Sequence, residues 1–289
     1  MKRLLSWLVG GIGFLGVLLL SVHYIVTHQI PVLQPSGWVG LRERDLIVTC
    51  TFLMLIVVIP VFAIAWYFVV RFRRGKGKGG YSPDYENNAI AEVCWWGVPL
   101  VIMMILGVIT WRSSHELNPF KPLDQPGVPL RVQVVALDWK WLFLYPDEGV
   151  ASVNSLYLPV NRPICFDITA DAPMNSFWIP DLGGMMMAMP GMSTQLNLIA
   201  NREGSYMGRS SQISGRGFSG MVFTAVATDE VAFEEWIERA KSKGSTLNVA
   251  EYSTLSAPSE YVTPEYYRLE ERRLYEEILL KYMMGKETA

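Results

Sequence analysis

The sequence predicts a membrane-anchored α + β protein, with an N-terminal transmembrane helical hairpin, then an antiparallel β-sandwich and a helical C-terminal tail. Two long runs without charged residues predict the hairpin, and short alternating apolar segments separated by turn residues predict the sandwich. The hydrophobic fraction of 51% is high for a soluble protein and agrees with membrane segments. The net charge of −2 gives no reason to expect a nucleic-acid partner.

Residues 1–30 have the order of a signal sequence and precede the hairpin. Lys2 and Arg3 come before an uncharged run that is longer than the usual apolar centre of a signal peptide, about 7–15 residues. No A-x-A cleavage pattern follows, and no cysteine is present there to accept a lipid. An uncleaved signal anchor fits these observations better, and a cleaved signal peptide stays an alternative.

The transmembrane hairpin is expected at residues 45–115. Its helices are expected at about 46–70 and 92–111, where each uncharged run is close to or above the roughly 20 residues that span the hydrocarbon core. The connecting loop, residues 71–91, carries a cluster of basic residues: Arg71, Arg73, Arg74, Lys76 and Lys78. Basic short loops stay in the cytoplasm, so the chain after the second helix is expected on the extracytoplasmic side.

Residues 126–230 are expected to form the extracytoplasmic β domain. The candidate strands are LRVQVVAL, WLFLYP, SLYLP, CFDITA, TQLNLIA and MVFTAVA. Residues 231–289 then change to a helical pattern in VAFEEWIERAKSKG and in PEYYRLEERRLYEEILLKYM. The second of these is expected to be a charged amphipathic helix that packs on the sandwich or on a partner.

The usual metal ligands are scarce. The three cysteines, Cys50, Cys94 and Cys165, have no CxxC spacing, which supports neither a disulfide framework nor a cysteine metal site. The three histidines are His23, His28 and His115, and all of them precede the predicted sandwich.

One glycine-rich loop has the outline of a metal site without the usual ligands. The loop SSQISGRGFSGM, residues 210–221, presents Ser210, Ser214, Phe218 and Met221 at regular intervals. Soft metal ions favour thiolate and imidazole ligands, whereas a serine hydroxyl stays protonated and Phe218 has no lone pair. Met221 alone keeps a soft donor.

The order of parts and this loop resemble subunit II of the haem–copper respiratory oxidases. In members that use cytochrome c, the loop reads Cys-x-x-x-Cys-x-x-x-His-x-x-Met, and another histidine opens a His-Ser-Phe-x-Ile-Pro motif. Here the motif reads NSFWIP, and AEVCWWGVP, DWKWLFLYP, the PGM turn and APSEYVTPEYY are further similarities. In those members the ligands hold a pair of copper ions, which the single thioether of Met221 cannot do. The resemblance therefore implies vacated copper-pair positions at Asn175, Ser210, Gln212, Ser214, Phe218 and Met221. These departures resemble the branch of cytochrome bo-type ubiquinol oxidases.

The resemblance implies a cupredoxin-like sandwich without a metal of its own, in a non-catalytic subunit of a proton-pumping complex. That complex would oxidise ubiquinol and reduce oxygen to water, with haem and copper in the catalytic subunit I. Subunits III and IV and membrane lipid are the other expected partners, and no cytochrome c docking is expected. The expected location is the bacterial inner membrane, with the C-terminal domain in the periplasm.

Glu92 stands directly before the second uncharged run. An ionisable group at membrane depth is a functional hypothesis by default. A carboxylate is also common at a helix N-terminus, where the helix dipole favours it. The resemblance favours the first interpretation, because a glutamate at the matching family position lies at the entrance of a proton pathway. We therefore expect Glu92 to load protons from the cytoplasm.

Four aromatic residues, Trp139, Trp141, Phe143 and Tyr145, alternate along one candidate strand and are expected on one face. Such a face belongs either to a core or to an interface. In copper-bearing relatives this region helps electrons to enter. Without copper that role has no destination, so we assign the four residues to packing against the partner subunits.

The methionine run GGMMMAMPGM allows two interpretations. Its thioethers, from Met185, Met186, Met187, Met189 and Met192, could bind Cu(I), but such a run more often provides adaptable packing. A free-standing, membrane-tethered Cu(I)-binding protein is therefore one alternative function. A copper-bearing cytochrome c oxidase subunit is the other, and the missing ligands argue against it.

Overall fold

The structure is a computed structural model that describes residues 30–72, 88–123, 125 and 127–284, with scattered positions between 13 and 27. Most of the predicted signal or anchor segment at 1–30 and most of the predicted cytoplasmic loop at 71–91 lie outside the described residues. The chain divides into two compact units: Arg42–Asn118, and Met1–Leu41 together with Pro119–Ala289.

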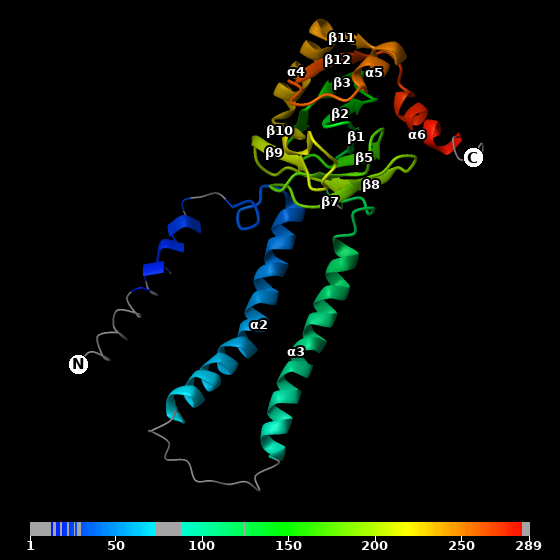
Figure 1. Cartoon of the computed structure of the whole chain (residues 1–289). Coiled ribbons are helices and arrows are strands. Elements are labelled where there is room, and N and C mark those ends of the chain that lie inside the picture. The colour runs from blue at the N-terminus through cyan, green and yellow to red at the C-terminus, as the bar shows by residue number, and fades with distance from the viewer. Residues whose placement is uncertain are drawn as a thin grey trace. The chain divides into compact units, whose positions relative to one another are not determined.

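Two long helices, α2 (Trp38–Arg71) and α3 (Ala89–Glu116), account for the predicted hairpin (Figure 1). Both are long and apolar enough to cross a membrane, judged by length and composition. Each helix continues beyond the predicted bounds of 46–70 and 92–111. An uncharged run marks only the part suited to the hydrocarbon core, while charged residues such as Arg44 and Arg112 extend the same helices.

The second unit contains two β-sheets (Figure 1). The seven-stranded sheet has the order β11-β12-β3-β2-β1-β5-β8, and the five-stranded sheet has the order β4-β10-β9-β6-β7. The first consists of β1 (Leu130–Leu137), β2 (Lys140–Tyr145), β3 (Val150–Val153), β5 (Ile164–Ala170), β8 (Thr194–Leu198), β11 (Ser245–Leu247) and β12 (Glu265–Leu269). The second consists of β4 (Ser155–Pro159), β6 (Asn175–Trp178), β7 (Met185–Ala188), β9 (Gly204–Ser210) and β10 (Val222–Thr228).

The sandwich is cupredoxin-like and mainly antiparallel, as predicted. The neighbours β1–β5, β4–β10 and β11–β12 nevertheless run parallel. Parallel neighbours need long connections, and in the first two pairs these pass from one sheet to the other. All six candidate strands of the sequence correspond to observed strands, from β1 to β10.

The core between the two sheets is aromatic. Phe177 and Phe223 stack with ring centroids 5.3 Å apart and planes 5° from parallel. The Trp141 ring meets both of them edge-on, at 5.5 and 5.8 Å. Phe143 lies 5.1 Å from Phe223, so the inward-facing side of β2 is filled by rings from the opposite sheet.

The C-terminal segment packs on the sandwich, and its part from Leu247 onward covers the outer face of the seven-stranded sheet. Its helices are α4 (Glu230–Lys243), α5 (Val249–Leu255) and α6 (Leu274–Met284). Leu142 and Leu144 of β2 belong to one buried cluster with Tyr252, Leu274 and Ile278 from this segment. Strand β2 is therefore buried on both faces, which explains its unbroken run of buried residues.

The prediction of one helix over PEYYRLEERRLYEEILLKYM is wrong in its first part. Glu265–Leu269 forms strand β12, which pairs with β3 and β11 and makes the C-terminal tail part of the sheet. Tyr267 and Leu269 are buried at alternate positions, which is the period of a strand. The helix begins only at Leu274.

Candidate functional site

Two of the positions predicted to be vacated copper-pair positions lie on neighbouring strands and bond to each other. Asn175 opens β6 and Ser210 ends β9. The Ser210 hydroxyl donates to Asn175 Oδ1 at 3.0 Å, and Asn175 Nδ2 donates to the carbonyl of Pro173 at 2.8 Å. Asn175 and Ser210 are 1% and 4% exposed, so the protein itself satisfies these buried polar groups.

Three further positions join this pair through the backbone. The Gln212 N–H donates to Ser210 Oγ at 3.3 Å, and the Ser210 N–H donates to the Met221 carbonyl at 3.3 Å. The Met221 N–H donates to the carbonyl of Phe218, which opens the short 3-10 helix η1 (Phe218–Gly220). The structure therefore brings Asn175, Gln212, Met221 and their neighbours into one hydrogen-bonded cluster.

Ser214 contacts Trp139 instead of the Asn175 cluster. Its carbonyl accepts a hydrogen bond from Trp139 Nε1 at 3.1 Å. Its hydroxyl is buried and has no partner among the described residues. Ser214 thus holds the loop against Trp139 through its backbone, and its side chain contributes no bond to the Asn175 cluster.

The residues of this cluster do not fit a copper pair. An amide, hydroxyls, a phenyl ring and one thioether provide neither the bridging thiolates nor the imidazoles that such a centre needs. Among the described residues, no group of three or more His, Cys, Asp or Glu could hold a metal ion. What the cluster can do is fix the loop by hydrogen bonds.

Trp139 does not lie on the strand face predicted for it. It forms the turn between β1 and β2 with a positive φ of 63°, which is unusual for a large side chain. Its ring packs against the backbone of the loop, and a Cβ on Gly217 would lie 2.5 Å from it. At Gly215, with φ of +111°, glycine is also required by the backbone conformation. Trp139 is a loop-packing residue that stays half-buried.

The other three aromatic residues correct the predicted subunit interface. Trp141, Phe143 and Tyr145 each have 0% exposure within the chain. A side chain without accessible surface cannot touch a partner, so these residues belong to the core of their own domain. Tyr145 in addition donates its hydroxyl to the Tyr157 carbonyl at 2.9 Å. Burial raises the pKa of this phenol, which stays neutral.

A C-terminal strap, residues 257–262, closes over the turn and the loop. The buried Lys140 ammonium donates to the Ala257 carbonyl at 2.8 Å and also to Ser259 Oγ. Asn154 Nδ2 donates to the Val262 carbonyl at 2.9 Å. Burial lowers the pKa of Lys140. The strap therefore provides hydrogen-bond acceptors for a buried ammonium group next to Trp139.

The strap also contacts the vacated loop directly. Arg216 and Glu260 form an ion pair of 2.7 Å, and the Arg216 guanidinium lies 6.0 Å from the Trp139 ring centroid. A Cβ on Gly220 would lie 2.7 Å from the Tyr261 ring. Loop and strap thus form one packed surface.

Asp171 is a key polar residue that the sequence did not indicate. Its buried carboxylate accepts hydrogen bonds from Tyr252 (2.6 Å), Tyr282 (2.6 Å) and the Lys281 ammonium (2.7 Å). These bonds join α5 and α6 to the end of β5. Burial acts to raise the pKa of Asp171, but the bonds from Lys281 and the two tyrosines outweigh it and lower the pKa. A lone aspartate after a strand gives no local signal of this role.

Glu92 lies in the first turn of α3, as predicted. The Asn88 side chain caps this helix by accepting from the Ala91 N–H at 3.0 Å, and the Glu92 N–H donates to the Asn88 carbonyl at 2.9 Å. The Glu92 side chain is exposed within the chain. This position suits both contact with a partner and interaction with the helix dipole.

The methionine run forms the edge strand β7 and the turn after it. Two thioether sulfurs accept hydrogen bonds from hydroxyl groups: Met185 from Ser211 at 2.7 Å, and Met187 from Ser176 at 3.3 Å. Met185 is 51% exposed. These contacts hold β7 to its neighbours, and this leaves the binding of Cu(I) an untested alternative.

Fold and site together define a class: an apolar helical hairpin joined to a cupredoxin-like domain whose ligand positions do not fit copper. A family model described as "Cytochrome C oxidase subunit II, periplasmic domain" matches residues 149–228. Another, "COX Aromatic Rich Motif", matches residues 241–286, which include the strap, β12 and α6.

Three relatives specify the family further. "Cytochrome bo(3) ubiquinol oxidase subunit 2" of Pseudomonas aeruginosa is 46% identical over 249 residues, covering 86% of this chain and 75% of the relative. The Pseudomonas putida protein of the same name is 43% identical over 259 residues, covering 90% and 81%. "Ubiquinol oxidase subunit 2" of Acetobacter aceti is 45% identical over 259 residues, covering 89% and 84%. The chain belongs to the family of ubiquinol oxidase subunit 2.

Proposed function

We propose that this chain is the non-catalytic second subunit of a proton-pumping ubiquinol oxidase and carries no copper pair of its own. The observation that carries the proposal is the hydrogen bond between Ser210 and Asn175, two positions where copper-bearing members of the wider family hold ligands. Because the two side chains bond to each other, neutral polar groups occupy the place of the metal ligands. The family membership supplies the reaction class.

In this proposal the chain anchors the complex in a bacterial inner membrane through α2 and α3 and caps its periplasmic face. Haem, copper and the oxidation of ubiquinol belong to subunit I, with subunits III and IV as further partners. The proposal includes no docking of cytochrome c, because an electron that entered at Trp139 would find no metal site in this domain to accept it. Glu92 loads protons at the cytoplasmic end of α3.

Isolation of the complex through a tag on this chain tests the proposal. Co-purifying haem, one copper per complex and no near-infrared band of a copper pair are expected. Copper bound to this chain without any haem would contradict the proposal and would favour the methionine run as a Cu(I) site. Two further copper ions with a near-infrared band would favour a copper-bearing subunit.

A further inference from the structure

Asn88 fixes the start of α3 with two hydrogen bonds. Its backbone is extended, with φ of −136° and ψ of 99°, which is the usual conformation of an N-cap residue. Its side-chain oxygen accepts from the Ala91 N–H at 3.0 Å, and its carbonyl accepts from the Glu92 N–H at 2.9 Å. Asn88 therefore holds the backbone of Ala91 and of Glu92 in the first turn of the helix.

The Glu92 carboxylate is not part of this cap. In a capping box, the acidic residue lies three positions after the N-cap and bonds back to the N-cap N–H. Ala91 occupies that position here, and Glu92 lies one residue further along α3. The Glu92 side chain is exposed and forms no hydrogen bond or ion pair among the described residues. The cap thus fixes the backbone of Glu92 and leaves its carboxylate available to accept a proton.

The position of the Glu92 carboxylate depends on whether this first turn is formed. Helix ends fray unless the free N–H groups of the first turn find acceptors. Replacement of an N-cap asparagine by alanine raises the ratio of frayed to formed turn by about fivefold. In a frayed turn the Glu92 N–H loses its bond to Asn88, and the carboxylate loses its fixed place on α3. Proton transfer needs a fixed place, because donor and acceptor must lie within hydrogen-bond reach.

We propose that Asn88 is a positioning residue for proton uptake through Glu92. The proposal rests on the proposed function, in which Glu92 loads protons at the cytoplasmic end of α3. Asn88 carries no proton itself. Its side-chain and carbonyl oxygens keep the first turn formed, so that the Glu92 carboxylate is presented at one place to the cytoplasm and to the partner subunit.

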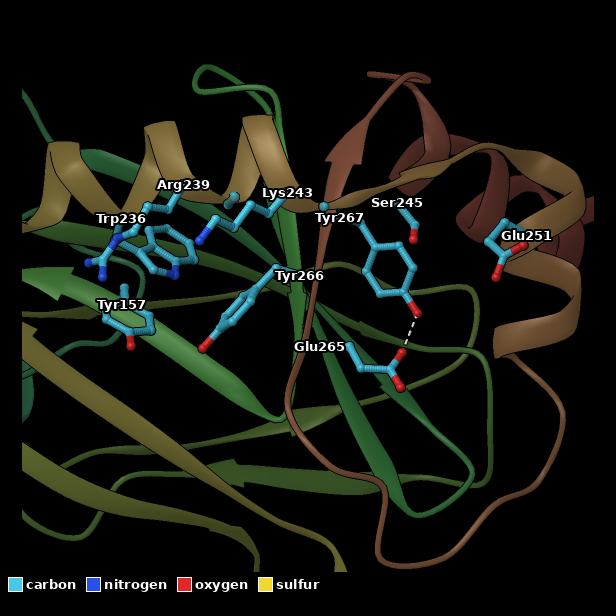
Figure 2. Close-up of a pocket in the computed structure, with 11 residues that line it drawn as sticks. Tyr157, Trp236, Arg239, Lys243, Ser245, Glu251, Glu265, Tyr266 and Tyr267 are labelled. Atoms are coloured by element: carbon cyan, nitrogen blue, oxygen red, sulfur yellow. Dashed lines mark hydrogen bonds between the residues drawn. The ribbon is translucent and has the colours of Figure 1, made fainter.

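Helix α5 begins in the same way and provides a matched control. Asn248 Oδ1 accepts from the Glu251 N–H at 2.9 Å, and the Asn248 carbonyl accepts from the Tyr252 N–H at 2.9 Å. Glu251 is also exposed, and Figure 2 shows its side chain beside a pocket of ≈ 550 Å³ in the β domain. The proposed function gives α5 no part in proton loading. Loss of the Asn248 cap therefore shows what the loss of any asparagine cap does to the complex.

Quinol-dependent oxygen consumption of the purified complex, measured over a pH series and expressed per haem, tests the proposal. Asn88→Ala should lower kcat by up to about fivefold, the factor by which fraying increases, and should leave the KM for ubiquinol unchanged. The loss should grow as the pH rises, because fewer protons are then available for loading. Asn88→Ser keeps a side-chain acceptor at the N-cap and should restore both kcat and the pH profile. Asn248→Ala should change neither.

A double variant separates positioning from general damage. Asn88→Ala added to Glu92→Gln should cause no further loss, because the group that Asn88 positions is already removed. Unchanged kcat and pH profile in Asn88→Ala, beside a loss in Glu92→Gln, would overturn this proposal and leave the proposed function intact. Equal losses in Asn88→Ala and Asn248→Ala would also overturn it. An unaffected Glu92→Gln complex would instead contradict the proton-loading part of the proposed function, and this proposal with it.

Discussion

The hydroxyl of Ser210 donates to the side-chain oxygen of Asn175 at 3.0 Å, across 35 residues of sequence. Both residues are almost fully buried. One neutral hydrogen bond between these side chains helps to connect β9 to β6. The bond therefore contributes to stability, and its loss leaves a buried acceptor.

Ser210→Ala should destabilise the β domain by about 1–3 kcal/mol, because Asn175 Oδ1 loses its partner in a site closed to water. Urea unfolding of the purified protein in detergent, followed by tryptophan fluorescence, measures the change. Ser211→Ala is the matched control, since the neighbouring hydroxyl is exposed and bonds only a thioether. Equal stability of the two variants would show that the buried bond contributes nothing.

Gly217→Ala should displace Trp139, because the added Cβ would lie 2.5 Å from the indole ring. Overpacking of this kind costs about 1–3 kcal/mol. The emission of Trp139, compared with that of a Trp139→Phe reference, should shift to longer wavelength as the ring gains contact with water. Ser219→Ala, in the same loop but less buried, should leave the emission unchanged. An unshifted Gly217→Ala spectrum would show that the loop absorbs the extra atom.

The strap should depend on Lys140 far more than on the ion pair of Arg216 with Glu260. Lys140→Met removes charge-assisted bonds from a residue that is 2% exposed, and a bond of this kind contributes about 1.5–3 kcal/mol. Arg216→Gln breaks a pair whose Arg216 side chain is 83% exposed, which is worth at most about 1 kcal/mol. Limited proteolysis at residues 257–262 should therefore be faster for Lys140→Met. The reverse order would mean that the exposed pair holds the strap.

Local patterns predicted the elements well where one physical signal dominated. Runs without charge indicated α2 and α3, and alternation indicated strands such as β1 and β10. The strand β12 was missed because Glu265–Leu269 lies in a charged stretch, and its pairing with β3 depends on residues more than 100 positions earlier. Long-range pairing of this kind leaves almost no local signal.

The donor atoms of the candidate site follow from residue identity alone, whereas its contacts do not. The side-chain types at Ser210 and Asn175 argue against a copper pair on that basis. The alternation of Trp141, Phe143 and Tyr145 could not separate a core from an interface, because both require the same apolar face. Rings from the five-stranded sheet cover that face and make it core. Trp139 was misplaced because its positive φ begins a turn that an aromatic residue seldom forms.

The Asp171 cluster should make attachment of α5 and α6 sensitive to acid. The folded-state pKa of Asp171 is lowered, so its contribution is fully present above the unfolded value of about 3.9 and is lost as pH falls through the folded value. Proteolysis of α6 should be slow from pH 7 to about 5 and should accelerate only below about 4. Asp171→Asn should weaken the attachment at neutral pH and remove most of this acid dependence. A steep response retained in Asp171→Asn would assign it to another carboxyl group.

Glu92→Gln should lower quinol-dependent oxygen consumption and change its pH dependence. The substitution keeps the size and the position of the side chain at the start of α3 but removes its ability to carry a proton. Removing a carboxylate also weakens a favourable interaction with the helix dipole, which affects stability but not the pH profile. Glu116→Gln at the opposite end of α3 is the control, because Glu116 pairs with Arg42. If turnover and pH profile match those of the unmodified complex, Glu92 does not load protons and acts only as a carboxylate at the helix terminus.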